Sequence, residues 1–154
     1  MEITNVSVNV TAKRGTEIKA YASILIDKCF AIKDIRIIKR ENGYLVAMPS
    51  RKVGNGVYED VAHPINHETR QMVSVRILNK FFEEVQSLIE VIERPQGYYL
   101  GVSENDIHSI TLYREEESET RQGEEIGTYV LEDFSIETLK TLEAKIKEKV
   151  RSEE

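Results

Sequence analysis

The sequence has a single cysteine, Cys29, and this scarcity excludes two kinds of architecture. One thiol cannot form an intramolecular disulfide, and it cannot supply the several sulfur ligands of a cysteine-rich metal cage. A catalytic thiol needs a nearby base and partial exposure, whereas Cys29 stands beside the apolar Phe30. We therefore expect Cys29 to be a small, buried hydrophobic residue.

Long hydrophobic runs are also missing. No apolar stretch reaches the roughly 20 residues that a membrane-spanning helix needs, and Met1 and Glu2 lead directly into a strand-like pattern without the features of a signal peptide. The chain has 154 residues, of which 40% are apolar and 31% charged. A chain of this size buries about two thirds of its unfolded surface. We expect a soluble, cytoplasmic protein with one domain, or one domain and a small appendage.

The motifs of common enzyme classes are absent as well. There is no Gly-x-Ser-x-Gly elbow, no Cys-His pair at a recognised spacing and no phosphate loop of the Gly-x4-Gly-Lys-Ser/Thr type. His63 and His67 have the spacing of two metal ligands on a helix, but Pro64 interrupts the segment, so the imidazoles need not share a face. We expect packed or capping histidines, a structural His108, no metal and no enzymatic activity. A metal-dependent hydrolase at His63 and His67 is the distant alternative.

Charge is divided unevenly along the chain. Residues 1–82 contain 13 Lys and Arg against 8 Asp and Glu, a net charge of +5. Residues 83–154 contain 8 against 19, a net charge of −11. Because a basic front part and an acidic back part attract different partners, the total of −6 argues only weakly against nucleic-acid binding.

The front part reads as antiparallel strands joined by tight turns. Apolar residues alternate from Val6 to Val10 and again from Ile18 to Ile26, which predicts two strands of a hairpin. Further strands are expected at residues 30–39, 44–48 and 57–63, separated by the turns Asp27-Lys28, Asn42-Gly43 and Gly54-Asn55-Gly56. The last turn has the Gly-x-Gly spacing of a phosphate cradle, but a strand rather than a helix follows it, which favours a hairpin.

A helix is expected from Asn66 to about residue 90. Apolar residues recur there at every fourth position, and Asn66 is a suitable N-cap with Pro64 just before it. The repeated residues are Val73, Ile77, Phe81, Val85 and Ile89. This stripe should cover one face of the sheet.

A second segment begins after Pro95-Gln96-Gly97. Strands are expected at residues 97–102, 107–113 and 127–134, followed by a helix at 135–150 with Ser135 as its N-cap. The glutamate-rich tract 114–125 is expected to be a solvated hairpin tip. We therefore predict an α+β protein with two domains. A meander covered by one helix should form residues 1–94, and an acidic β-β-β-α extension should form residues 95–154.

Three phrases in order, "IKDIRII", "GYLVAMPSRK" and "AHPIN", resemble the stage V sporulation protein G (SpoVG) family of bacterial septation and sporulation regulators. The resemblance covers residues 2–82. It implies a sheet-plus-helix protein that forms homodimers through its strands and binds DNA and RNA, without enzymatic activity or a cofactor. Family members are usually shorter, so the acidic part from about Pro95 onward is a departure.

Candidate nucleic-acid contacts follow from the positions of the cations. Arg51 and Lys52 follow Pro49 at the end of a strand, so we expect them on a projecting loop, where they either contact phosphates or act as solvated charges that deter aggregation. Arg70 and Gln71 lie in the first turn of the expected helix, where free N–H groups favour anions or simply complete the cap. The remaining candidates are Lys39 and Arg40, with Lys33, Arg36, Arg76 and Lys80 in support.

These features lead to one preferred function and two alternatives. We predict a homodimeric regulator that binds DNA or RNA through its basic residues. A protein-interaction module that uses sheet edges or the acidic extension is the alternative. A third hypothesis has the acidic extension cover the basic front and weaken nucleic-acid binding by competition.

Overall fold

The computed structural model describes residues 1–116 and 123–154, and it confirms the predicted α+β class. The chain forms two compact units, Met1–Glu84 and Val85–Glu154. The division falls inside helix α1 (His67–Ile89), whose last turns contribute Ile89 to the core of the second unit. The domain boundary expected between residues 94 and 95 stays a prediction.

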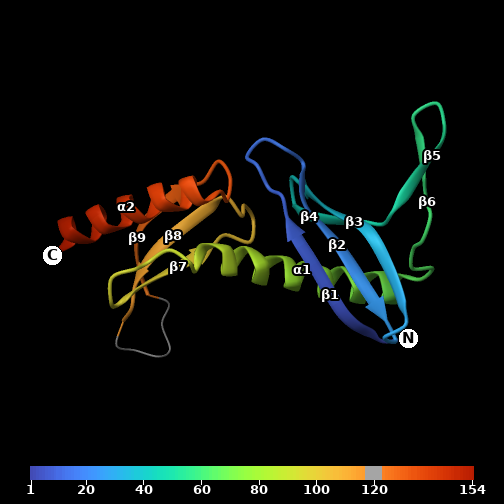
Figure 1. The fold of residues 1–154 in the computed structure, drawn as a ribbon, viewed down its shortest axis with the longest axis horizontal. Coiled ribbons are helices and arrows are strands. Elements are labelled where there is room, and N and C mark those ends of the chain that lie inside the picture. The colour runs from blue at the N-terminus through green and yellow to red at the C-terminus, as the bar shows by residue number, and fades with distance from the viewer. Residues whose placement is uncertain (117–122) are drawn as a thin grey trace. The chain divides into compact units, whose positions relative to one another are not determined.

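Unit 1 contains an antiparallel meander in the order β1-β2-β3-β4 (Figure 1). Its strands are β1 (Ile3–Val10), β2 (Ile18–Ile26), β3 (Phe30–Arg40) and β4 (Gly43–Ala47). Side chains alternate between the two faces, so the register brings Ala22 and Ile35 together on the buried face and Tyr21 and Arg36 together on the other. The four strands expected from the alternating pattern are confirmed.

The turn between β2 and β3 corrects the expectation for Cys29. Asp27 and Lys28 both have positive φ, as a tight hairpin turn requires, and the amide of Cys29 donates to the carbonyl of Ile26 at 3.0 Å. The turn lies at one end of the sheet, and Phe30, the first residue of β3, is also 64% exposed there. Cys29 is therefore exposed, and the prediction that it is buried was wrong.

The next two strands leave the meander and pair only with each other. β5 (Ser50–Gly54) and β6 (Val57–Asp60) form a two-stranded antiparallel hairpin around the Gly54-Asn55-Gly56 turn, where Gly56 has a φ of +74°. At its base the amide of Val61 donates to the carbonyl of Pro49 at 2.7 Å. We call residues 50–60 the arm. Figure 1 shows it extending away from β1–β4, and the expected hairpin is confirmed.

α1 supplies the apolar layer that unit 1 needs. The side-chain oxygen of Asn66 accepts a hydrogen bond from the amide of Thr69 at 2.8 Å, so the predicted N-cap is confirmed. Val73, Ile77 and Phe81 follow at intervals of four residues, and their side chains are buried. The Phe81 ring meets Tyr44 of β4 edge-to-face at 5.3 Å. α1 therefore covers one face of the sheet.

Unit 2 repeats the same principle with fewer strands. Its antiparallel sheet has the order β7 (Tyr98–Val102), β8 (Ser109–Arg114) and β9 (Glu124–Val130), and α2 (Ile136–Glu153) packs on it. The Ser135 hydroxyl accepts from the amide of Thr138 at 3.3 Å, which confirms the second predicted cap. The buried residues of this core include Ile89, Leu100, Ile110, Leu112, Leu142 and Ile146.

The third strand of unit 2 differs from the sequence prediction. β9 occupies residues 124–130 rather than 127–134, and Arg114 of β8 forms a 2.7 Å ion pair with Glu124 across the ladder. The charged residues that suggested a loop thus begin a strand, because opposite charges compensate across the pair. The middle of the expected glutamate-rich hairpin tip, residues 117–122, lies outside the described residues. Neither helix has the length and apolarity that crossing a bilayer requires, as far as residues 1–116 and 123–154 are concerned.

Candidate nucleic-acid interface

The arm presents the first predicted cations on a strand, not on a loop. Arg51 and Lys52 are adjacent residues of β5, and every residue from Arg51 to Asp60 is exposed. Successive side chains of a strand point to opposite faces. The two cations therefore lie on opposite sides of a thin ribbon, where each reaches solvent separately.

The strand partners give these two faces different chemistry. Arg51 is opposite Glu59, so its charge has a carboxylate as its cross-strand neighbour. Lys52 is opposite Tyr58, whose side chain is 65% exposed. Neither cation forms an ion pair with any residue that the structure describes. The Lys52 face thus combines an unpaired cation with an exposed aromatic ring.

The start of α1 holds the second predicted pair, and its two members differ. The Arg70 guanidinium donates to the carbonyl of Pro64 at 3.2 Å, so this side chain fixes the segment that leads into the helix. Gln71 is exposed and has no such contact among the described residues. Asn66 caps one free amide, and Glu68 brings a carboxylate into the first turn. The Asn66 cap and the Glu68 carboxylate therefore already compensate much of the partial positive charge at the start of α1.

The third predicted pair lies at the hairpin between β3 and β4. The Lys39 ammonium is 4.9 Å from the centroid of the Tyr44 ring, a cation–π contact across the strands. Arg40 forms a 3.7 Å ion pair with Glu17. Both cations therefore already have partners within unit 1.

The predicted residues do not form one cluster. Tyr44, which contacts Lys39, packs against Phe81, and Phe81 is eleven residues along α1 from Arg70. At 1.5 Å per residue this separation is about 16 Å. The structure therefore distributes the candidates over three places: the arm, the start of α1 and the β3–β4 hairpin.

The supporting cations are equally dispersed. Lys33 and Asp34 form a bulge opposite Ser23 in the β2–β3 ladder, and Arg36 donates to the Ser50 hydroxyl at 3.4 Å at the base of the arm. Arg76 and Lys80, one turn apart on α1, line a polar hollow of about 260 Å³ beside β1. Lys80 also pairs with Glu84 at 3.2 Å.

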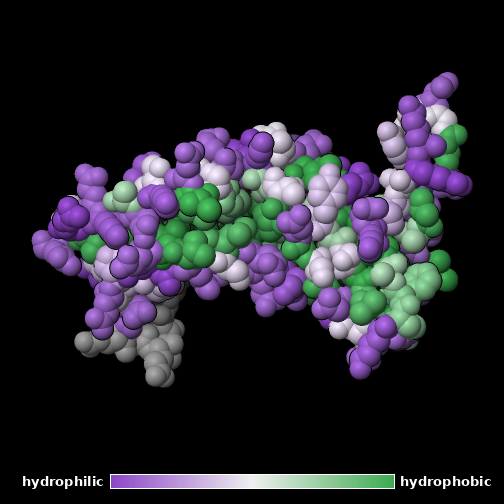
Figure 2. All heavy atoms as spheres, in the orientation of Figure 1, coloured by the Kyte–Doolittle hydropathy of each residue, from purple (hydrophilic) through white to green (hydrophobic). Residues whose placement is uncertain are grey.

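Sequence reasoning did not name Tyr58 as a contact residue. Its position directly across from Lys52 depends on the register of β5 and β6, in which a bulge between Lys52 and Gly54 shifts the pairing. The signal that could have found it is an aromatic residue two positions after a Gly-x-Gly turn, on the strand that returns past a basic pair. Figure 2 shows hydrophobic and hydrophilic atoms side by side on the arm.

The histidines occupy different structural settings. The Nδ1 atom of His63 is 2.9 Å from the carbonyl of Pro64, whereas His67 begins α1 beyond the turn. His108 is buried, with its Nδ1 atom 2.7 Å from the carbonyl of Leu131, which agrees with the structural role expected for it. In residues 1–116 and 123–154 no three His, Cys, Asp or Glu side chains are grouped as a metal ion requires.

Comparison with known proteins gives one consistent result. The SpoVG family profile matches residues 1–83, one residue short of the end of unit 1. A septation protein SpoVG of Agathobacter rectalis is 42% identical over 88 residues, which cover 57% of this chain and all of the relative. Those of Caldicellulosiruptor bescii and Lachnoclostridium phytofermentans are 43% and 47% identical over 81 residues, which cover 53% of this chain and 91% and 86% of the relatives.

Proposed function

The chain belongs to the SpoVG family, whose relatives are named as septation proteins, and from this premise we propose that it is a regulator that binds nucleic acid without catalysing a reaction. The proposal concerns unit 1, which coincides with the family match. Unit 1 contains 13 Lys and Arg against 10 Asp and Glu, a net charge of +3 that attracts a polyanion.

The observation that supports it most is the Lys52–Tyr58 face of the arm. Lysine neutralises a phosphate and releases its counterion, and an exposed tyrosine ring offers a stacking surface to any unpaired base. The cross-strand register holds these two groups side by side on an exposed ribbon. Arg51 on the other side adds a second phosphate contact.

This arrangement favours single strands. Stacking on Tyr58 needs an unstacked base, which single-stranded RNA or DNA offers and an intact duplex does not. A two-stranded ribbon also fits the width of the duplex major groove, so duplex DNA is the competing target. In that groove Arg51 and Lys52 would contact the phosphates on either side.

A second copy of the chain would double this surface. Apolar side chains remain exposed from β6 into the segment before α1, with Val57, Val61 and Ile65 at 58%, 65% and 91% exposure. A homodimer that covers them explains their exposure in one protomer. Sedimentation equilibrium of the wild type and of Ile65→Ser tests this: the wild type should be dimeric and the variant should dissociate more readily. A monomeric wild type at about 100 µM, a concentration at which even a weak complex forms, would contradict the dimer.

The direct test of nucleic-acid binding is a titration of the full chain by fluorescence anisotropy. Labelled single-stranded RNA and duplex DNA of equal length are compared from low to high salt. We expect the logarithm of affinity to fall linearly with the logarithm of salt concentration, with a slope of about 0.7 per phosphate contact on single strands and about 0.9 on duplex. Binding to neither probe at low salt would refute the proposed function.

A further inference from the structure

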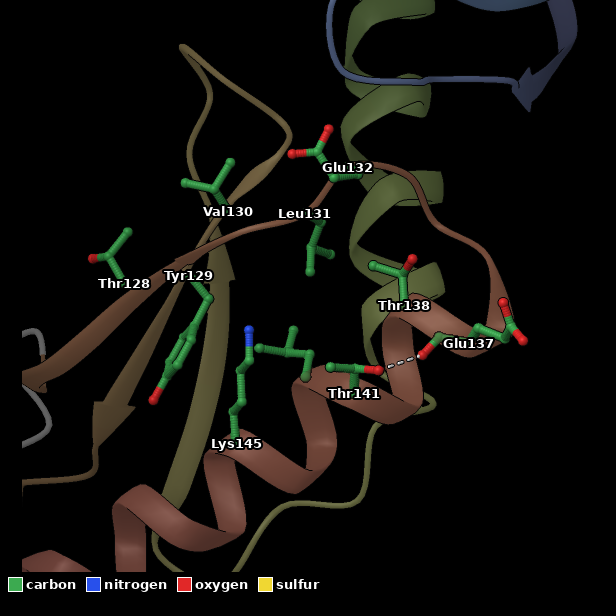
Figure 3. A pocket seen from close by; sticks show the side chains of 10 residues that line it. Thr128, Tyr129, Val130, Leu131, Glu132, Glu137, Thr138, Thr141 and Lys145 are labelled. Atoms are coloured by element: carbon green, nitrogen blue, oxygen red, sulfur yellow. Dashed lines mark hydrogen bonds between the residues drawn. The ribbon is translucent and has the colours of Figure 1, made fainter.

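Unit 2 has a groove beside the open edge of its sheet. β9 pairs with β8 on one side, and no strand of the described residues pairs with its other side. The groove holds about 550 Å³ and runs between residues 128–132 and one side of α2. In Figure 3 the side chains of Thr138, Thr141 and Lys145 face the strand across this space.

The register shows which backbone groups of β9 point outward. The amide of Leu131 donates to the carbonyl of His108 at 2.8 Å, which makes these two residues a hydrogen-bonded pair. Hydrogen-bonded and non-bonded pairs alternate along an antiparallel ladder, so Tyr129 bonds to Ile110 of β8. The N–H and C=O groups of Thr128 and Val130 must then point away from β8, toward the open edge.

The opposite wall has a matching length. Thr138, Thr141 and Lys145 recur at intervals of three and four residues and so lie along one face of α2. They cover about 10 Å of helix, which equals about three residues of an extended strand. A helix inserted in the groove could not reach the outward backbone groups of β9 with its own, which are already bonded internally.

A cation lies on the helix wall of the groove. Lys145 lies at the Tyr129 end and forms no ion pair with a described residue, whereas Glu137, near the start of α2, directs its carboxylate away from β9 in Figure 3. An occupant thus meets an unpaired cation at the end of the groove beside Tyr129. Unit 2 as a whole carries 8 basic and 17 acidic residues, so a strongly acidic partner is disfavoured.

We propose that this groove binds an extended segment of a partner protein as a fourth strand beside β9. The segment runs antiparallel to β9, with an acidic side chain at its carboxyl-terminal end near Lys145. Main-chain hydrogen bonds to Thr128 and Val130 supply affinity, and the charge pair with Lys145 supplies direction. The inference does not depend on nucleic-acid binding by unit 1.

Two capped peptides of identical composition test the direction. Arg-Thr-Val-Thr-Val-Glu places its acidic end beside Lys145, and Glu-Thr-Val-Thr-Val-Arg places a basic end there. By isothermal titration of the full chain, the first should bind about fivefold more tightly, because a favourable surface pair with Lys145 becomes an unfavourable one. Lys145→Glu should reverse this preference, whereas Lys140→Glu, the same charge change elsewhere on α2, should leave it intact.

Amide hydrogen exchange then locates the bound peptide. The first peptide should slow exchange at Thr128 and Val130 and leave Tyr129, already bonded to β8, unchanged. Absence of binding by both peptides, equal affinities, insensitivity to Lys145→Glu, or protection away from β9 would each overturn the proposal.

Discussion

The two units solve the same folding problem and differ in what they expose. In each, antiparallel strands are covered by an amphipathic helix that begins at a polar N-cap, Asn66 in unit 1 and Ser135 in unit 2. The exposed features are different: unit 1 extends an arm with two unpaired cations, and unit 2 has an acidic surface with an open edge beside a groove. The comparison teaches that similar cores leave function to the charges and edges left outside them.

Core truncation should give the largest effect and show how far the cores are equivalent. Phe81→Ala in unit 1 and Ile146→Ala in unit 2 both remove fully buried side chains. We expect losses of about 3–5 and about 2–5 kcal/mol in the free energy of unfolding, measured by urea denaturation. The half-exposed Val75→Ala is the control, with a change within about 0.5 kcal/mol. If either core substitution lowered the free energy of unfolding as little as Val75→Ala does, the core that contains it would not be closely packed.

Removing the Tyr58 ring tests how much the exposed aromatic group of the arm contributes to RNA binding. Tyr58→Ala should weaken binding of single-stranded RNA by about 1–3 kcal/mol, because a base loses its stacking partner. Tyr58→Phe retains the ring and should bind nearly as the wild type does. Anisotropy titrations measure both. Equal losses in the two variants would assign the effect to the hydroxyl group and exclude stacking.

Substitutions of the two N-caps compare how much the first turns of α1 and α2 contribute to stability. Asn66→Ala and Ser135→Ala should each lower the free energy of unfolding by about 1 kcal/mol, since each leaves an amide without its acceptor. Thermal unfolding followed by circular dichroism measures the change. Asn66→Asp and Ser135→Thr retain an acceptor and should recover most of the stability; failure to do so would mean that the caps act by another route.

The smallest effect is expected at the β3–β4 hairpin. Arg40→Gln removes an ion pair whose members are 50% and 79% exposed, so stability should change by less than about 0.5 kcal/mol. The affinity for RNA should also stay nearly constant, because Arg40 is already paired with Glu17. A loss as large as that caused by changes in the arm would place Arg40 in the interface and remove the distinction that we draw between the two places.

Local sequence patterns predicted most of the fold. Alternation from Ile18 to Ile26, the turns at Asp27-Lys28 and Asn42-Gly43, and both caps have short-range physical causes, so they are visible without tertiary structure. The start of β9 was missed because its charged residues are stabilised by a partner on another strand. Cys29 was misplaced because burial depends on which layer reaches a turn, and composition does not record that.

Local sequence patterns predicted fewer features of the candidate site. Adjacent cations were correctly expected to project from unit 1, but their separation onto two faces follows from strand geometry that the loop prediction lacked. Tyr58 depends on cross-strand register, and the groove beside β9 depends on where α2 packs. Such features join residues distant in sequence, so patterns of short range do not contain them.

The most direct test of the account measures the salt dependence of RNA binding after the arm loses its charges. Arg51→Gln with Lys52→Gln should reduce the slope of log affinity against log salt by about 1.4 per protomer on single-stranded RNA. Lys13→Gln with Lys28→Gln removes the same charge from exposed positions outside the arm and should leave the slope nearly unchanged. Equal slopes for these two variants would contradict the claim that the arm is the nucleic-acid contact of unit 1.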